Sequence, residues 1–257
     1  MHSLCGGKII FSSYPPKLIL ICGPCRVGTT ALSNVFAKAG IESHMQPIKS
    51  ARRAKADGEE SIPWRIGTKR EEFAAVKETF GPKTEAEFFN PLEILLSNGY
   101  PKERLIVIPI VRNPNQALAS WKRMWGKVEL GRFAYTYELT FKIMEEAEKN
   151  GILTIPYVHE IIKDQEPSAI VKKLFKLVGL PSNHLTNNSW GEFKGSENVF
   201  FYDDPPERFV SGIKERGKYE YKDLAFSEED RKLVESAPQL EVIYGIFRKL
   251  CESRLAL

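Results

Sequence analysis

The stretch Lys17–Leu32, KLILICGPCRVGTTAL, constrains the fold of this chain more than any other part of it. Its apolar run 18–21 has the length and the β-branched content of a buried parallel strand. Residues 29–32 open a pattern typical of a helix. Between them, Gly23 and Gly28 have the G-x-x-x-x-G spacing of a loop whose backbone N–H groups converge on an anion. The sequence therefore predicts a strand–loop–helix unit that binds a phosphate group.

The residue after Gly28 departs from the usual nucleotide-binding pattern. An ATP- or GTP-binding loop carries Lys at this place, and this chain carries Thr29. A phosphate site without that Lys points away from nucleoside triphosphate hydrolysis. The identity of the phosphate must therefore be inferred from the rest of the chain.

Length, composition and charge set broad limits on the class of protein. The 257 residues fit one α/β domain spanning 1–257, and the 42% hydrophobic and 27% charged shares are ordinary for a globular protein. A net charge of +4 is too small to indicate nucleic-acid binding, but it suits an anionic cofactor or substrate. No apolar run approaches the roughly 18 residues of a membrane span. The N-terminus lacks a signal peptide's apolar core, and the four cysteines do not resemble a disulfide framework, so we expect a cytoplasmic protein.

Strand and helix patterns alternate along the chain, which predicts a three-layer α/β/α fold with a mainly parallel central sheet. Pro109 inside one strand argues for a local irregularity or an edge position. The expected strands are 18–22, 105–111 and 152–158, with a further short one near Ile41. The expected helices are 29–39, 69–79, 91–97, 114–125, 132–149, 167–178, 227–236 and 239–253.

Three segments lack a clear helix or strand pattern. Residues 1–16 are interpreted as an irregular lead-in that ends at a Pro-Pro pair. Residues 46–68 are basic and acidic with little apolar content, and the segment 181–210 is enriched in Asn and Ser over 181–200. We expect these last two segments to form mobile or substrate-facing loops.

A second anion-binding element follows the strand 105–111. Arg112 ends that strand, Asn113-Pro114 begins a helix, and Ser120 lies eight residues beyond Arg112. An arginine fork and a hydroxyl about two turns into the helix can hold a second phosphate. Each residue alone is a weak signal, because an arginine before a helix is often a structural ion-pair partner.

Together, the two elements resemble the sulfotransferase family, which transfers a sulfuryl group from 3'-phosphoadenosine-5'-phosphosulfate (PAPS). The stretch 25–30, Cys25-Arg26-Val27-Gly28-Thr29-Thr30, is similar to the family's Pro-Lys/Arg-Ser-Gly-Thr-Thr loop for the 5'-phosphosulfate, with Cys and Val as departures. Arg112-Asn113-Pro114 with Ser120 is similar to the family's 3'-phosphate element. The family also lacks the nucleotide-loop Lys, so the resemblance accounts for Thr29.

The resemblance extends from about residue 17 to 245. The strand end at 157–160 is similar to a family Tyr-Glu motif, and Arg216, Gly217 and Lys218 occupy the place of a basic loop that closes over the 3'-phosphate. The resemblance implies a P-loop NTPase-like sulfotransferase fold and PAPS as co-substrate, with no metal. It implies sulfuryl transfer to a hydroxyl or amine of a small-molecule or carbohydrate acceptor, without nucleic acid.

The sequence identifies the catalytic base less specifically than the phosphate-binding residues. Lys83-Thr84-Glu85 resembles the family's Lys-Thr-His segment, in which the His is the catalytic base, so Glu85 is the favoured base here. Strand alternation would put Glu87 on the same face, and His44 is a third candidate. A glutamate base would need burial to raise its pKa towards neutrality. Lys83 and Arg26 are the candidate stabilisers of negative charge on the leaving phosphate.

Two alternative functions remain open at this stage. A kinase-like P-loop phosphotransferase would share the glycine spacing but would carry Lys where Thr29 stands. Cys22-Gly23-Pro24-Cys25 has the C-x-x-C sequence of a thioredoxin-like redox site, although such chemistry explains neither Gly28-Thr29-Thr30 nor Arg112 and Ser120. The four histidines show no metal-ligand spacing, and no G-x-S-x-G nucleophile motif is present.

Overall fold

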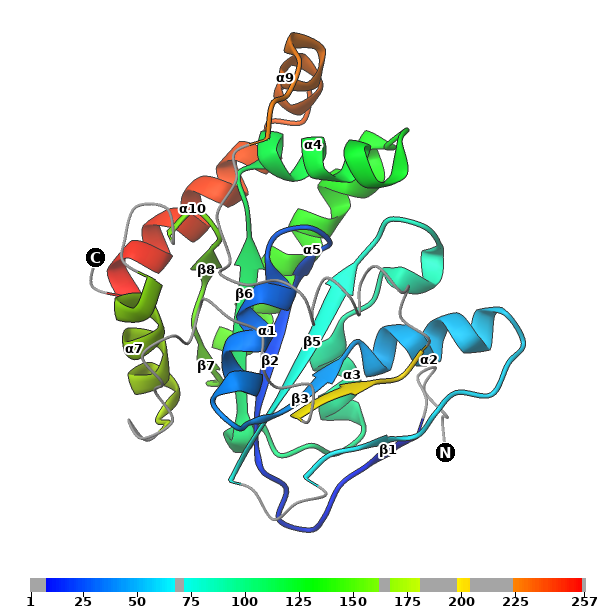
Figure 1. The fold of residues 1–257 in the computed structure, drawn as a ribbon, viewed down its shortest axis with the longest axis vertical. Coiled ribbons are helices and arrows are strands. Elements are labelled where there is room, and N and C mark those ends of the chain that lie inside the picture. Colours follow the sequence, from blue (N-terminus) through cyan, green and yellow to red (C-terminus); the bar gives the residue numbers. More distant parts are fainter. Residues whose placement is uncertain (1–7, 68–71, 162–166, 181–197, 204–223, 256–257) are drawn as a thin grey trace.

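A computed structural model gives the fold of the chain, and the structure describes residues 8–67, 72–161, 167–180, 198–203 and 224–255. The strands of the main sheet are β2 (Lys17–Pro24), β3 (Glu42–Met45), β5 (Phe73–Phe80), β6 (Leu105–Val111), β7 (Leu153–Thr154), β8 (Tyr157–Val158) and β9 (Val199–Phe201). Their order is β7-β6-β2-β5-β3-β9, and β8 also pairs with β6 (Figure 1). All pairings between these strands are parallel.

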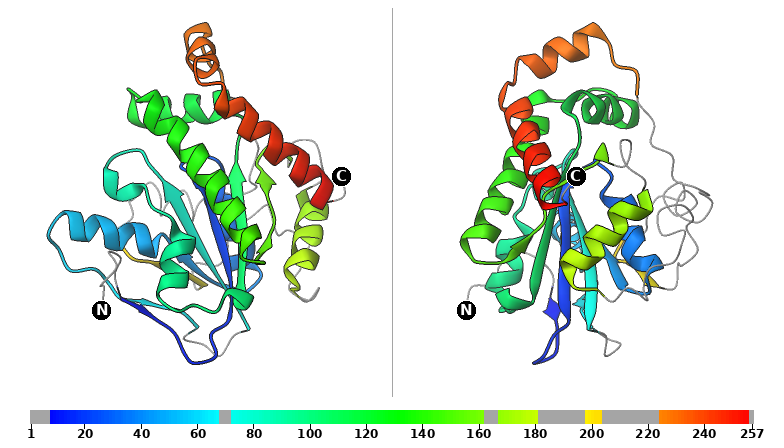
Figure 2. Two further views of the ribbon diagram at one scale, coloured as in Figure 1. Left: turned by 180° about the vertical axis from the view of Figure 1, so that it is seen from behind. Right: turned by 90° about the vertical axis from the view of Figure 1, so that its left-hand side faces the viewer.

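Helices cover both faces of this sheet. The helices are α1 (Thr29–Lys38), α2 (Pro47–Ala56), α3 (Pro91–Ser97), α4 (Pro114–Trp125), α5 (Leu130–Lys149), α7 (Pro167–Val178), α9 (Glu228–Glu235) and α10 (Gln239–Arg254). Short 3-10 turns occur at η1 (Glu85–Glu87) and η2 (Lys102–Arg104). In the edge-on view of Figure 2, α3 and α5 lie on one side of the sheet and α1 and α7 on the other. The α/β class with a mainly parallel sheet is thus confirmed.

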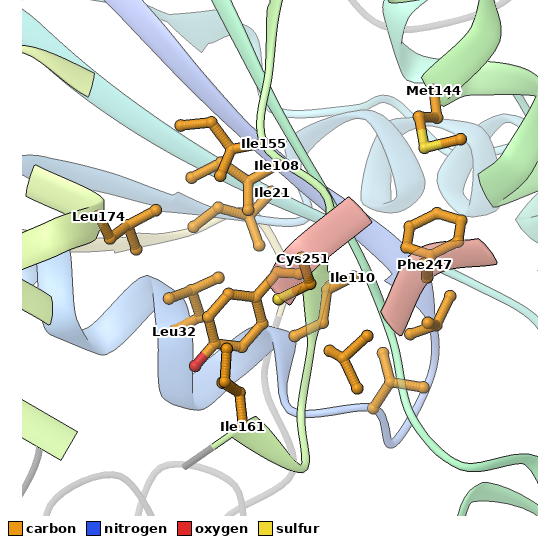
Figure 3. Close-up of a cluster of buried hydrophobic side chains, with 14 of the residues drawn as sticks. Ile21, Leu32, Ile108, Ile110, Met144, Ile155, Ile161, Leu174, Phe247 and Cys251 are labelled. Atoms are coloured by element: carbon orange, nitrogen blue, oxygen red, sulfur yellow. The ribbon is translucent and has the colours of Figure 1, made fainter. Parts of the chain in front are cut away.

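The central strand β2 is buried on both faces, which explains its uninterrupted apolar run. Leu18 and Leu20 belong to the core cluster that contains α3 and α5 side chains. Ile19 and Ile21 belong to the other cluster, with Leu32 of α1 and side chains of α7 (Figure 3). Successive side chains of a strand point to opposite faces, so β2 contributes to both halves of the core.

Pro109 lies in a central strand, so the edge position considered for it is wrong. Strand β6 pairs with β2 on one side and with β7 and β8 on the other. The pairing with β7 ends at Val107 and the pairing with β8 begins at Ile110, so the expected strand 152–158 forms two short strands. The break coincides with the proline, which has no N–H to donate. The predicted irregularity is confirmed.

The predicted helix at 69–79 is also wrong, because residues 73–80 form the fully buried strand β5. Phe73, Val76 and Phe80 suggested one helix face, yet they also suit a strand that is buried on both sides. Strand β5 pairs with β2 and with β3, so tertiary burial decides its conformation.

The segment 46–68 is not a solvated loop, since most of its first half forms α2. Pro47 occupies the first helical position, and Lys49, Ser50 and Ala51 are buried. Strand β4 (Trp64–Arg65) pairs with β1 (Ile9–Ile10) in a small parallel sheet, so the lead-in 1–16 is partly regular. Of the second predicted loop, 198–203 includes β9 and the rest lies outside the described residues.

The strand order places a topological switch point beside β2. From β2 the chain passes to β3 and β5 on one side, and then crosses to β6 on the other. In open α/β sheets, ligands bind where the order reverses, outside the carboxyl ends of the strands. Residues 25–28 follow β2 and Arg112 follows β6, so both predicted anion-binding elements flank this switch point. None of the described helices is long and apolar enough to span a bilayer.

Candidate anion-binding site

The loop between β2 and α1, residues 25–28, has the backbone of an anion-binding loop. Arg26 and Gly28 both have left-handed conformations, with φ of 70° and 96°. Gly28 is the N-cap of α1, so no capping side chain satisfies the N–H groups of the first helical turn. Those groups, and the positive end of the helix dipole, meet at this loop. Val27 and Thr29 are buried and Thr30 is half-buried, which anchors the loop to the core.

His159, directly after β8, packs against this loop at Gly28. A β-carbon added to Gly28 would overlap the imidazole ring, so only glycine fits there. Burial, and next the charge of Arg112, lower the pKa of His159 to about 3. A neutral imidazole therefore supports the loop near pH 7.

Arg112 and Ser120 lie where the sequence predicts them, at the end of β6 and inside α4. The Arg112 side chain is 9% exposed and its Nε lies 3.7 Å from Glu160 Oε1. Its NH2 donates to Gln116 Oε1 at 3.4 Å, and the Tyr137 hydroxyl donates to its carbonyl oxygen at 2.7 Å. These contacts hold the guanidinium beside the switch point.

The two predicted anion-binding elements touch each other. Arg26 Nε donates a hydrogen bond to Ser120 Oγ at 3.1 Å, although the residues are 94 positions apart in the sequence. Ser120 itself is 5% exposed. The loop after β2 and the helix after β6 therefore present Arg26, Ser120 and the first-turn N–H groups of α1 at one place.

The segment that carries Lys83 and Glu85 is a turn and a 3-10 helix, so strand alternation does not apply to it. Glu85 has a side chain that is 80% exposed and that pairs with Arg132 of α5. Lys83 is also exposed. The burial that we expected a glutamate base to need is therefore absent at Glu85.

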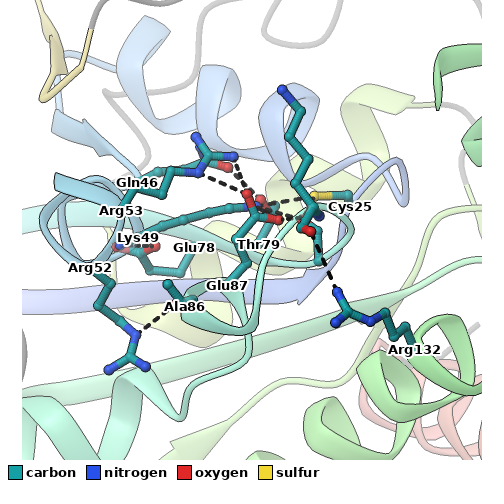
Figure 4. A network of polar contacts seen from close by, with 12 residues as sticks. Cys25, Gln46, Lys49, Arg52, Arg53, Glu78, Thr79, Ala86, Glu87 and Arg132 are labelled. Carbon is teal, nitrogen blue, oxygen red and sulfur yellow. Dashed lines mark hydrogen bonds and ion pairs between the residues drawn. The ribbon is translucent and has the colours of Figure 1, made fainter. Parts of the chain in front are cut away.

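Glu87 is fully buried, and its two carboxylate oxygens are occupied (Figure 4). Arg53 donates to Oε1 from Nε at 2.8 Å and from NH2 at 2.5 Å. Oε2 accepts the Lys83 N–H at 2.9 Å and lies 3.5 Å from Lys49 Nζ. A carboxylate held by so many donors anchors the segment to α2 and is poorly placed to remove a proton from a substrate.

His44 lies away from the loop. It is buried in β3, and β5 separates β3 from β2 in the sheet. Its Nδ1 lies 2.7 Å from the Tyr202 hydroxyl and its Nε2 lies 2.7 Å from Glu42 Oε1. Both ring nitrogens of His44 thus face protein groups in β3 and next to β9, and β5 lies between His44 and the loop after β2.

The two cysteines of CGPC do not have the geometry of a redox pair. Cys22, Gly23 and Pro24 all belong to β2, so Cys25 lies about 10 Å along an extended chain from Cys22, beyond disulfide reach. Burial, and next the charge of Glu78, raise the pKa of Cys22. Cys25 Sγ donates instead to the Gly81 carbonyl at 3.0 Å. The thioredoxin-like alternative has no structural basis here.

Lys49 is the site residue that the sequence did not suggest. It belongs to the segment predicted as a solvated loop, and its ammonium lies beneath Cys25. The Gln46-Pro47 start of a helix was the available signal, but nothing local showed that a lysine would point inward. Three further predicted residues, Arg216, Gly217 and Lys218, lie outside the described residues.

Comparison with known protein families finds no family that matches the chain, and comparison with curated proteins finds no match. Within the described ranges, no group of three or more His, Cys, Asp or Glu side chains is placed to hold a metal ion.

Proposed function

We propose that the chain is a sulfotransferase that moves a sulfuryl group from PAPS to a hydroxyl or amine of an acceptor. The observation that carries this proposal is the hydrogen bond from Arg26 to Ser120, which joins the loop after β2 to the helix after β6. A ligand with phosphate groups at both ends of one ribose would engage both elements at once. PAPS has this shape, with a 5'-phosphosulfate and a 3'-phosphate.

The absence of a loop lysine favours such a ligand over a linear triphosphate. A triphosphate extends past the loop and needs a lysine on its terminal phosphates, and Thr29 stands at that position. A single phosphosulfate needs the loop N–H groups and one neighbouring cation, and Arg26 is that cation. Arg112 and Ser120 would then hold the 3'-phosphate.

In this proposal the protein promotes the transfer by positioning the co-substrate and by placing positive charge beside the leaving phosphate. The N–H groups at the start of α1 and the guanidinium of Arg26 would stabilise the charge that grows on the leaving phosphate. Glu85 remains the proposed base, with Lys83 beside it, because Glu87 is occupied by Arg53, Lys49 and the Lys83 N–H. An exposed Glu85 would acquire a desolvated environment only once an acceptor covers it.

The proposal is tested by ligand-induced stabilisation. Adenosine 3',5'-bisphosphate, the spent co-substrate, should raise the melting temperature far more than equal concentrations of ATP, GTP or AMP. Equal stabilisation by ATP would overturn the proposal and favour a kinase-like P-loop phosphotransferase. The Ser120→Ala variant is a second test, because it removes only the hydroxyl proposed to hold the 3'-phosphate. In this variant the rise in melting temperature caused by the bisphosphate should be closer to the rise caused by AMP.

A further inference from the structure

A buried lysine lies behind the loop after β2. Lys49 extends from α2 towards Cys25 and Glu87, and its side chain is 2% exposed (Figure 4). Its Nζ donates to the Gly81 carbonyl at 2.6 Å and lies 3.6 Å from Cys25 Sγ. The ammonium is thus placed directly beneath the first residue of the anion-binding loop.

Positive side chains outnumber negative ones around the Lys49 ammonium. Glu87 is the buried carboxylate that faces it, at 3.5 Å, and Arg53 makes two shorter contacts to the same carboxylate. Two cations therefore share one buried anion. Arg53 also reaches Asp203 at 3.4 Å, but there both side chains are about a third exposed and water screens the pair.

The neighbouring residues on β5 do not supply the missing negative charge. The Glu78 carboxyl accepts the backbone N–H groups of Ile48 and Lys49 at 2.7 and 3.3 Å, and burial raises its pKa. Lys77, the residue before it, is an amine whose pKa burial lowers, so this acid and this base offset each other and add no net negative charge. The surroundings of Lys49 therefore keep a surplus of positive charge in a region of low dielectric, where uncompensated charge is costly.

We infer that Lys49 is a positioning residue that supplies, from beneath the loop, the positive charge that Thr29 leaves out. Its ammonium fixes Cys25 and the Gly81 carbonyl in place, and its charge is balanced when an anion occupies the other side of the loop. This inference rests on the proposed anion-binding function of the loop but not on which nucleotide binds. A buried cation is already desolvated, so its field reaches the anion with little screening.

The test uses two substitutions with opposite expected signs. Lys49→Met keeps the length of the side chain and removes its charge, and it should weaken binding of adenosine 3',5'-bisphosphate about tenfold. Glu87→Gln removes the opposing negative charge, and it should strengthen the same binding severalfold. A merely structural role would make both variants bind more weakly, which would overturn the inference. Lys55→Met, at an exposed position of the same helix, is the matched control and should bind like the unchanged protein.

Ligand identity provides the second readout, by calorimetric titration with adenosine 3',5'-bisphosphate, AMP, ATP and pyrophosphate. The loss caused by Lys49→Met should be similar for the bisphosphate and for AMP, because both place a 5'-phosphate on the loop, and an unchanged affinity for both would contradict the inference. Binding of pyrophosphate or ATP with the same Lys49 dependence, but not of the bisphosphate, would support the inference and refute the proposed sulfotransferase. If the unchanged protein binds none of these anions, both are refuted. If Lys49→Met does not fold, Glu87→Gln alone decides by the sign of its effect.

Discussion

His159 packs its imidazole directly over Gly28, the residue at which the loop after β2 becomes α1. The two residues come from distant parts of the sequence. Gly28 has a φ of 96°, which side chains avoid, and His159 is 2% exposed. This contact links the strand β8 to the loop after β2, so the loop is supported from the β6–β8 side of the sheet as well as by its own strand.

We predict that Gly28→Ala costs about 2–4 kcal/mol of unfolding free energy, because it combines left-handed strain with overlap on the His159 ring. Urea denaturation measures this cost. The double variant Gly28→Ala with His159→Ala should recover the part that comes from overlap, so its loss should be smaller than the sum of the two single losses. Strict additivity would show that the ring and the glycine do not interact.

Protonation of His159 should make stability depend on pH. Its pKa is about 3 in the folded protein and near the ordinary 6.5 when unfolded, so the unfolded chain binds more protons between these values. The contribution of the neutral ring is therefore complete above pH 6.5 and is lost as the pH falls towards 3, at up to about 1.4 kcal/mol per pH unit.

The measurement is the urea midpoint at pH 7.5, 6.0 and 4.5 for the unchanged protein and for His159→Gln, which cannot titrate. Carboxyl groups titrate in both proteins, so the relevant quantity is the difference between them. The stability advantage of the unchanged protein should shrink by about 2 kcal/mol between pH 6.0 and 4.5. A constant difference across this range would contradict the buried neutral histidine.

The sequence predicted the parts of the fold and site that depend on local pattern. It predicted the buried strand β2 from its apolar run, the start of α4 at Asn113-Pro114, and the positions of Arg112 and Ser120. Asn113 does accept hydrogen bonds from the N–H groups of Asn115 and Gln116. Local rules determine these features, because a cap or a buried strand needs only its immediate neighbours to be recognised.

The features that the sequence did not predict depend on distant partners. Strand β5 has an ambiguous pattern and is fixed by pairing on both sides with β2 and β3. The sequence predicted a solvated loop around Lys49 and made Glu87 a candidate base, yet the two are buried together, with Arg53 as a second cation on the same carboxylate. Such compensation between α2 and η1 leaves no trace in either segment alone.

Glu85 and Glu87 are two residues apart, and we expect opposite results when each is changed to alanine. Glu87→Ala should cost about 3–5 kcal/mol of stability, since it leaves the buried Lys49 and the half-buried Arg53 without their carboxylate. Glu85→Ala should change stability by no more than about 0.5 kcal/mol, because its side chain is 80% exposed. If Glu85 is the base, only that variant should fold normally, bind adenosine 3',5'-bisphosphate normally and lose sulfuryl transfer. Normal transfer by Glu85→Ala would remove it from the mechanism.

The cysteines should behave as independent buried thiols. We expect no disulfide between Cys22 and Cys25 after treatment with oxidised glutathione or diamide, because β2 holds them apart. Mass spectrometry of the native and the denatured protein checks this, since the denatured chain is free to form the bond. The protein should also fail to reduce insulin. A Cys22–Cys25 disulfide formed in the native protein would show that the end of β2 can rearrange.

Arg112 should contribute more to nucleotide binding than Arg26, because it is nearly buried whereas Arg26 is exposed. Charge-assisted hydrogen bonds to a phosphate gain strength when water is excluded, so Arg112→Ala should weaken binding of adenosine 3',5'-bisphosphate by about 2–3 kcal/mol. Arg26→Ala should cost about 1 kcal/mol of binding free energy. The additional cost of Arg26→Ala should be smaller when Ser120→Ala is already present, because the two side chains share a hydrogen bond. Calorimetric titration of the unchanged protein, the three single variants and the double variant gives these affinities. If Arg112→Ala binds the bisphosphate as tightly as the unchanged protein, then Arg112 serves only its ion pair with Glu160, and the second phosphate must bind elsewhere.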